Sequence, residues 1–533
     1  MDSVMEVSMR GLVILGAVLV VLGAGCSEDP RRTGDGSTGD TGSARDNGAA
    51  DARSSQENPP TPDAAFDAGS GGDGPPADGP SADTGPAADG PVADGPVADG
   101  PVADGPVADS PAPDQSKSDA AAGTMKSSVS QYGITWTFDK PYPCGQFVTG
   151  DWWVVGPAVV ASVQPAPTAT RNGSMLDPVG KQAYDSRAGE YDGAKGVKLP
   201  LTLTPTHSLV SSISHPEASA CTQGGAPGWF TYNNVCQRGP IKTQAVLTAV
   251  AAPQPADTFR PPYAGSSYKP LRRVSEVCWK LLPKLPAPSS APQATSVLRH
   301  LERPWIDHLN SWTMQHGCAT LNMFCYGREI GDIVSIVSAY ALLDTPSQQQ
   351  VATRLIQLGL DNYGVIKAGG GWGVDGGHFN GRKWPIVLAG ALLGDAAMRS
   401  PGAAIGNEDQ QTYYGTNGKA LFGKPCSNAC YFTSGCTYAG SCQAGSKDCR
   451  DPAGLVDGCA DYRNCCTSYT WVGEGLAALV LGLKADWGHD AFFDYVDRWM
   501  TGDVAGGGGT SSQLVTDLWK TYRNNLPTPG SCP

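Results

Sequence analysis

The stretch "GWGVDGGHFNGRKWP", residues 371–385, gathers the side chains best suited to chemistry. It holds a carboxylate, Asp375, an imidazole, His378, and two cations, Arg382 and Lys383, among five glycines. Loops that combine ionisable groups with backbone freedom are where catalytic sites are usually built. We therefore expect the floor of an active site in this stretch.

Two other stretches carry ionisable side chains near the start of predicted helices. In "DHLNSWTMQHGCATLNMFCYGREIGD", His308 and His316 are eight residues apart, so one continuous helix would place them on nearly the same face. The same stretch contains Tyr326 and Glu329, and in "YTWVGEGLAALV" Glu474 lies in a glycine-flanked turn just before an apolar helix. A carboxylate at a helix start also favours the positive end of the helix dipole, so a capping role stays open for both glutamates.

These side chains suit the hydrolysis of a glycosidic bond. That reaction needs two carboxyl groups across the scissile bond, one as an acid and one as a base or nucleophile. Asp375 paired with Glu329 or with Glu474 meets the requirement, because all three are expected in loops or first helical turns. The three carboxyl groups are therefore candidate catalytic residues.

The same stretches also suit β-elimination of a uronate glycan. This reaction needs a cation to neutralise the carboxylate, a base to take the C5 proton and an acid for the leaving oxygen. His378 with Tyr326, Tyr363 or Tyr413 would move the protons. Arg382 or Lys383 would hold the carboxylate. A planar guanidinium suits that bidentate contact best, so both reactions remain open.

Aromatic and polar side chains predict a sugar-binding surface. Flat rings with polar handles stack on sugar faces, and the chain has 13 tryptophans. In "GDWWVVG" two adjacent tryptophans point to opposite faces of a strand, so we expect one in the core and Trp152 exposed; core packing of both is the alternative. The residues expected to bind substrate are Trp152, His308, His316, Trp372 and Lys383.

The N-terminus has the pattern of an exported lipoprotein. The segment "MRGLVILGAVLVVLGAGC" places one positive charge before an apolar run shorter than the roughly 20 residues that span a bilayer. Its end resembles a bacterial lipobox, although Gly23 stands where leucine is usual. We expect residues 1–26 to be a signal peptide and Cys26 to carry a lipid. The lipid would anchor the protein to the outer membrane or cell surface; full secretion is the alternative.

A low-complexity segment follows. Residues 27–124 consist mostly of Asp, Gly, Pro, Ala and Ser and repeat "VADGP". Such a segment buries too little apolar surface to offset the entropy lost on ordering, so we expect a disordered tether. The net charge of −13 comes from this tether, and the part expected to fold is close to neutral.

The 16 cysteines agree with export, because disulfides form in oxidising compartments. Eight of them lie between Cys426 and Cys466, which predicts a disulfide-rich insertion over residues 424–468. A zinc site is disfavoured, because the cluster lacks C-x-x-C pairs and histidines. We expect no metal and no cofactor, and the odd number of cysteines after Cys26 leaves one free thiol.

The rest of the chain divides into a β part and an α part. Short runs rich in Val, Thr and aromatic residues predict a β-sandwich-like domain over residues 128–282. A proline-rich linker, residues 283–294, precedes residues 295–530, where apolar residues recur with a helical period. We expect this second domain to consist of α/α hairpins interrupted by the cysteine-rich insertion. Its clearest helices are residues 329–344 and 385–398.

Tryptophan- and glycine-rich loops between amphipathic helix pairs, in an exported protein, resemble the α/α-toroid (six-hairpin) superfamily of glycoside hydrolases and polysaccharide lyases. The resemblance covers residues 295–525 and implies a toroid-like ring of helices, complete or incomplete, whose loops line a sugar-binding cleft. Toroid hydrolases commonly carry a β-sandwich before the ring, and this order favours hydrolase over lyase.

Together with the motifs, the resemblance implies a carbohydrate-active enzyme that degrades a polysaccharide, as a glycoside hydrolase first and a polysaccharide lyase second. A non-catalytic glycan-binding surface lipoprotein is the third interpretation. The expected partners are a polysaccharide and, through Cys26, a membrane. We expect a monomer and no nucleic-acid partner, because the sequence shows no basic patch or recognition motif.

Overall fold

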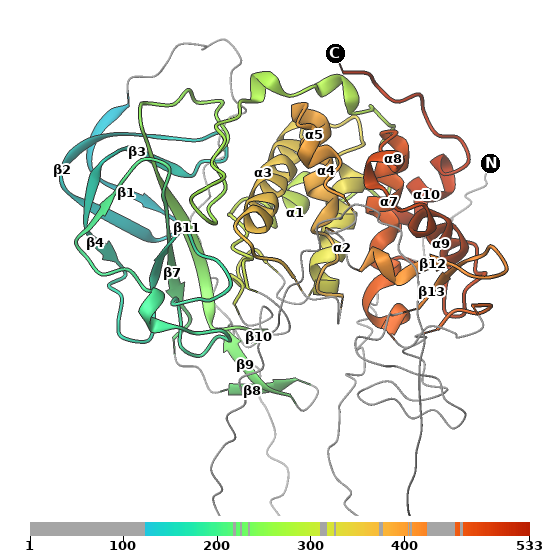
Figure 1. Ribbon diagram of the computed structural model, residues 1–533, viewed down its shortest axis with the longest axis horizontal. Helices are drawn as coiled ribbons and strands as arrows, with labels where there is room; N and C mark the ends of the chain where they lie inside the picture. The colour runs from blue at the N-terminus through green and yellow to red at the C-terminus, as the bar shows by residue number, and fades with distance from the viewer. Residues whose placement is uncertain are drawn as a thin grey trace, which may run out of the picture. The chain divides into compact units, whose positions relative to one another are not determined.

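The first half of the described structure is a mixed β-sheet that curls into a half-barrel (Figure 1). Its strands are β1 (Thr124–Gln131), β2 (Ile134–Gln146), β3 (Trp152–Val155), β4 (Ala158–Gln164), β5 (Ser174–Leu176), β6 (Leu201–Leu203), β7 (Ser208–Ser214) and β11 (Ile241–Val250). The structure is a computed structural model, and it describes residues 123–216, 220–223, 226–232, 235–309, 317–323, 327–372, 377–402, 405, 408–423, 454–458 and 462–532. The predicted signal peptide, Cys26 and the tether lie outside the described residues.

One long strand decides how the sheet is built. The order is β5–β7–β11–β3–β2–β4–β6, with β1 paired to β2, and only β11 and β3 pair in parallel. β2 is 13 residues long and pairs with β1, β3 and β4. Because β2 joins these strands, they form one curled sheet, and the prediction of a sandwich of two sheets was wrong. Irregular register between Thr137 and Phe138 adds to the bend.

The residues of β2 show why one face of the sheet is covered. Ile134, Trp136 and Phe138 are buried, whereas the intervening Thr135 and Thr137 are partly exposed. A strand with one covered face requires this period of two. The prediction of a β-rich first part is confirmed.

Two smaller sheets complete the β-structure of the described residues. One has the order β10–β9–β8, and the other is the pair β12–β13. Their strands are β8 (Ala220–Gln223), β9 (Ala226–Tyr232), β10 (Val235–Arg238), β12 (Thr412–Tyr414) and β13 (Ala420–Phe422). β12 and β13 lie against α9, so they belong to the helical part.

The second half of the described structure is mainly helical, as predicted. The helices are α1 (Ala294–Leu298), α2 (Gly327–Tyr340), α3 (Gln348–Lys367), α4 (Lys383–Leu393), α5 (Ala396–Arg399), α7 (Trp471–Val480), α8 (Lys484–Trp487), α9 (Asp490–Met500) and α10 (Gln513–Tyr522). α2 buries Ile330, Val334 and Val337 along one stripe, which is the helical period read from the sequence.

The helix predicted over residues 385–398 is divided in two. Pro385 lies in the first turn of α4, where its missing N–H leaves no helical bond unmade. α4 then ends at Gly394, whose φ of 66° is left-handed, and glycine is the usual residue for this helix end. α5 begins two residues later.

Several connections tie the helical part together. The proline-rich segment packs against the end of α2, because Leu285 is buried and exchanges backbone hydrogen bonds with Leu342 and Asp344. A disulfide joins Cys278 to Cys532. The predicted insertion over residues 424–468 lies mostly outside the described residues and stays a prediction. No helix in the described ranges is long and apolar enough to cross a membrane.

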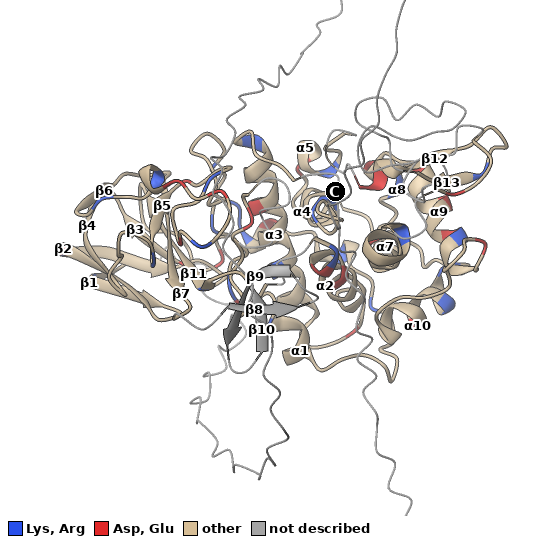
Figure 2. Cartoon of the chain, turned by 90° about the horizontal axis from the view of Figure 1, so that it is seen from below, with Lys and Arg blue, Asp and Glu red and all other residues tan. Residues whose placement is uncertain are grey.

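A buried ion network joins the sheet to α3, the helix nearest to it in Figures 1 and 2. The Arg260 guanidinium donates to both carboxylate oxygens of Asp361 in α3, at 3.0 and 2.6 Å, and to Asp151 at 2.8 Å. The Arg260 side chain is fully buried and both carboxylates are almost fully buried. The buried carboxylates of Asp151 and Asp361 are therefore both paired with the single guanidinium of Arg260.

Replacing Arg260 tests this joint. We expect Arg260→Gln to lower the free energy of unfolding by about 3–5 kcal/mol, because both carboxylates lose their cation while they stay buried. Urea unfolding followed by circular dichroism measures the change. The exposed Arg299 gives the control, since Arg299→Gln is expected to cost at most about 0.5 kcal/mol. Equal stability of the two variants would contradict this role of Arg260.

The disulfide makes a separate prediction. The bridge closes a loop between residues 254 positions apart, so it restricts the unfolded chain strongly. We expect the double substitution Cys278→Ser and Cys532→Ser to cost about 2–4 kcal/mol. Reduction should lower the melting temperature of the wild type more than that of the double variant, which has already lost this bridge. Cys144, the free cysteine among the described residues, provides the control Cys144→Ala, which should keep the response to reduction.

Candidate active site

The described part of the stretch 371–385 forms a tight loop against α2 and then enters α4. Gly381 has a left-handed φ of 72°, and a Cβ there would lie 2.9 Å from the Gly331 Cα. A Cβ on Gly327, in the first turn of α2, would lie 2.3 Å from the His378 Cα. Small residues on both sides therefore let the loop and the helix touch through their backbones. Asp375 lies outside the described residues.

The two cations of this loop are buried in ion pairs. The Arg382 guanidinium donates to the Asp307 carboxylate at 2.9 and 2.8 Å and to the Asn380 carbonyl at 2.8 Å. The Lys383 ammonium donates to Asp409 at 2.7 Å. Arg382 is 1 % exposed and Lys383 4 %. Neither cation is on the surface, although the sequence pattern suggested exposed groups.

A third carboxyl group lies beside these pairs without a hydrogen bond on one oxygen. Glu474 is 3 % exposed, and its Oε2 has no hydrogen-bond partner in the structure. Burial raises the pKa of Glu474 well above its usual range and Asp409 raises it further, while Lys383 and Arg382 lower it. Burial thus favours the protonated form of Glu474, which lies next to two ion pairs.

Neutral hydrogen bonds fix the surroundings of these charges. The Tyr462 hydroxyl donates to Glu408 at 2.8 Å and accepts from the Gly377 N–H at 3.0 Å. The Asn380 amide donates to the Cys466 carbonyl at 2.8 Å and its oxygen accepts from the Trp471 indole at 2.7 Å. The loop before α4 is thus bonded to the segments that precede α7.

The site consequently gathers five charged or acidic residues from four parts of the chain. We call this the buried acid cluster: Asp307, Arg382, Lys383, Asp409 and Glu474. In Figure 2, segments with basic and acidic residues are coloured on and near α2, α4, α7 and α8. Within this cluster, Arg382 pairs with Asp307 and Lys383 pairs with Asp409, so each cation already has a carboxylate partner other than Glu474. The arrangement favours a carboxylic acid that can give up a proton.

The other predicted catalytic residues occupy different places. Glu329 lies in the first turn of α2, about one-third exposed and 4.0 Å from Arg328. One turn later, burial raises the pKa of Asp332 to about 6. His378 is 2 % exposed in the loop against α2. Tyr326 lies outside the described residues. The structure thus brings Arg382, Lys383 and Glu474 together and keeps Glu329 nearer the surface.

The predicted sugar-binding residues are mostly covered. Trp372 is 4 % exposed, with its ring against Phe379 and the Arg382 guanidinium, so it packs instead of presenting a platform. Trp152 and Trp153 separate as expected, since Trp153 is buried and Trp152 is partly exposed. However, the Trp152 indole donates to the Ser130 carbonyl, which orients its ring toward the sheet.

His308 does not lie on a helix as supposed. It belongs to an extended segment, and its carbonyl accepts from the Gly180 N–H. Its ring is buried with a hydrogen bond to the Tyr184 hydroxyl at 3.2 Å, and burial lowers its pKa to about 3. His308 is therefore a neutral core histidine at the seam between sheet and helices. His316 lies outside the described residues.

Sequence reasoning missed Asp307, Asn380, Glu408, Asp409 and Tyr462. Asn380 lies within residues 371–385, but its amide is not ionisable, so it was not predicted as a site residue. Glu408 and Asp409 are adjacent acids followed by two glutamines, a pattern that ordinarily indicates a solvated loop. One feature of the sequence could have indicated these acids. Arg382 and Lys383, once buried, require carboxylate partners elsewhere in the chain.

Within the described residues, no three His, Cys, Asp or Glu side chains come together in a way that could hold a metal ion. Comparison of the chain with models of protein families, with curated proteins and with solved structures gives no match. The chemistry of the buried acid cluster is therefore the basis for the proposed function.

The raised pKa of Glu474 predicts how stability depends on pH. A carboxyl group with a raised folded-state pKa adds stability that is complete below its ordinary value of 4.5 and is lost as pH rises toward the raised value. We expect Glu474→Gln, which stays neutral, to be more stable than the wild type by about 1–3 kcal/mol at alkaline pH. Urea unfolding between about pH 5 and pH 9 measures the difference. A gap that narrows as pH rises would contradict the assignment.

Proposed function

We propose that the protein is a glycoside hydrolase that degrades a polysaccharide, with Glu474 as the general acid. The observation that carries the proposal is the burial of the Glu474 carboxyl group, which raises its pKa, beside the pairs Arg382–Asp307 and Lys383–Asp409. A glycosidase acid must hold its proton near neutral pH until the leaving oxygen needs it. Burial of Glu474 supplies that property.

A capping role explains Glu474 less well. It lies in the first turn of α7, where a carboxylate favours the helix dipole. That benefit needs the ionised form, whereas burial favours the neutral form, and one oxygen makes no hydrogen bond. An acid kept protonated at a cost in stability is typical of a functional group.

The second carboxyl group of the reaction is proposed to be Asp375. It precedes Gly377 by two residues in the loop that leads to Arg382. The helices α2, α3, α4 and α7 pack in the pairs α2–α3, α3–α4 and α2–α7, and we keep the toroid resemblance as part of this proposal. The lipid anchor at Cys26 and a cell-surface location belong to it as well, since an exported enzyme meets polysaccharide there.

The elimination mechanism is supported less well by the contacts. A lyase needs a cation that can take the uronate carboxylate, yet Arg382 already binds Asp307 through two nitrogens and Lys383 binds Asp409. Binding a uronate would require breaking a buried ion pair, which costs about 3–5 kcal/mol. Hydrolysis needs no such rearrangement.

Activity assays separate the mechanisms. A panel of neutral and uronate polysaccharides is incubated with the wild type, reading new reducing ends and absorbance near 235 nm. We expect reducing ends without absorbance, and a loss of about 10²–10⁴-fold in kcat for Glu474→Gln, the usual contribution of an acid catalyst. Because this variant should be at least as stable as the wild type, the loss cannot come from unfolding.

Two further variants in the same assay test the partner carboxylate. Asp375→Asn should reduce hydrolysis more than His378→Ala, and the reverse order would support elimination. Products that absorb at 235 nm would contradict the hydrolase proposal. Full activity of Glu474→Gln would remove Glu474 from its role.

A further inference from the structure

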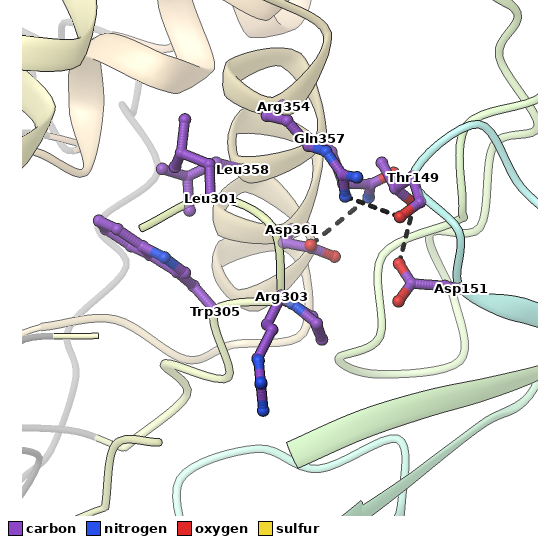
Figure 3. Close-up of a pocket in the computed structure, with 10 residues that line it drawn as sticks. Thr149, Asp151, Leu301, Arg303, Trp305, Arg354, Gln357, Leu358 and Asp361 are labelled. Carbon is purple, nitrogen blue, oxygen red and sulfur yellow. Dashed lines mark hydrogen bonds between the residues drawn. The ribbon is translucent and has the colours of Figure 1, made fainter. Parts of the chain in front are cut away.

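A small cavity lies at the seam between the sheet and α3, apart from the buried acid cluster (Figure 3). Its volume is about 20 Å³, which is room for roughly one water-sized group. One side opens to solvent. In Figure 3, Trp305, Leu301 and Leu358 lie on one side, Thr149 and Asp151 lie on the other, and Asp361 stands between them.

The polar wall of the cavity offers both acceptors and donors. Asp151 and Asp361 are fixed by Arg260, and each carboxylate oxygen has more than one acceptor site. Arg354 donates only through Nη1, to the Thr149 carbonyl at 2.7 Å and the Glu302 carbonyl at 3.3 Å. Its Nε and Nη2 make no hydrogen bond within the described residues, so donors remain for a ligand.

The charges at the cavity balance. Among the residues that line it, the cations Arg303 and Arg354 stand against the carboxylates Asp151 and Asp361. A charged ligand would therefore gain little electrostatic attraction. An uncharged ligand with hydroxyl groups matches the wall, because hydroxyls both donate to carboxylates and accept from a guanidinium.

The opposite wall is an aromatic and aliphatic surface. The Trp305 ring is buried and its indole N–H donates to the His300 carbonyl at 2.6 Å, so it gives the cavity an apolar edge and no hydrogen-bond donor. Ligand pockets commonly combine an aromatic or aliphatic wall with a few polar side chains. Such a pocket at the seam of two structural parts is also a frequent location.

We propose that this seam cavity is a subsite for a neutral sugar unit of the polysaccharide, holding one exocyclic hydroxyl group while the ring lies at the open mouth beside Trp305. The segment that lines the cavity at Trp305 also carries Asp307, the partner of Arg382. Two residues separate their Cα atoms by at most about 7 Å. One short segment of the chain therefore connects the cavity to the buried acid cluster. The inference rests on the proposed function for the identity of the ligand.

Binding to the full chain tests the subsite. Hexasaccharides of the cello, malto and N-acetylchito series are titrated by calorimetry in the Glu474→Gln background, in which turnover is slow. Arg354→Gln removes the donors, and Leu358→Phe fills the cavity while all polar contacts stay. Each should raise the Kd of the bound hexasaccharide at least about 10-fold, or about 1.4 kcal/mol.

The control is Arg299→Gln, which removes an exposed arginine outside the cavity and should bind like its parent. Thermal melting confirms that each variant is folded at the titration temperature. Equal binding by Arg354→Gln, Leu358→Phe and their parent overturns the subsite, as does a parent that binds none of the hexasaccharides. If the wild type hydrolyses the glycan but the cavity variants bind as their parent does, only the subsite proposal is contradicted. If the cavity variants weaken binding but the wild type does not hydrolyse the glycan, only the hydrolase proposal is contradicted.

Discussion

Buried arginine and lysine side chains, each held by carboxylates, organise this structure. Arg260 ties the sheet to α3 through Asp361, Arg382 ties the extended segment with Asp307 to the loop before α4, and Lys383 ties α4 to Asp409. A charge taken out of water is costly unless it is paired and hydrogen-bonded. These contacts therefore admit few alternative arrangements, and they fix how segments far apart in the sequence meet.

Glu474 is a buried charged-type side chain that does not take part in these ion pairs. Arg382 and Lys383 are each paired with another carboxylate, burial favours the protonated form of Glu474, and one of its oxygens has no hydrogen bond. The surrounding ion pairs do not neutralise it but hold it in place.

The seam between sheet and helices has a second consequence. Arg260 is needed to hold the two halves together, and the carboxylates that it orients also form one wall of a cavity. The extended segment around Trp305 and Asp307 runs from this cavity to the buried acid cluster. Structural and proposed binding roles thus share the same side chains.

Much of the helical part could be predicted from the sequence, because apolar period and helix-end residues are local signals. The stripe of α2, the start of α4 near Pro385 and the helices at the C-terminal end followed from them. The curled sheet could not be predicted, because the pairing of β2 with three strands depends on contacts distant in sequence. For the same reason, the pattern could not reveal that Trp372 packs against Arg382.

The sequence by itself determined which loop concentrates ionisable groups and that Glu474 stands beside an apolar helix. The folded chain shows which of these groups are paired: Arg382 binds Asp307, Lys383 binds Asp409, and the buried Glu474 has a raised pKa. The physical reason is that protonation depends on burial and on neighbouring charges. Both are properties of segments brought together by folding, and a single stretch of sequence does not contain them.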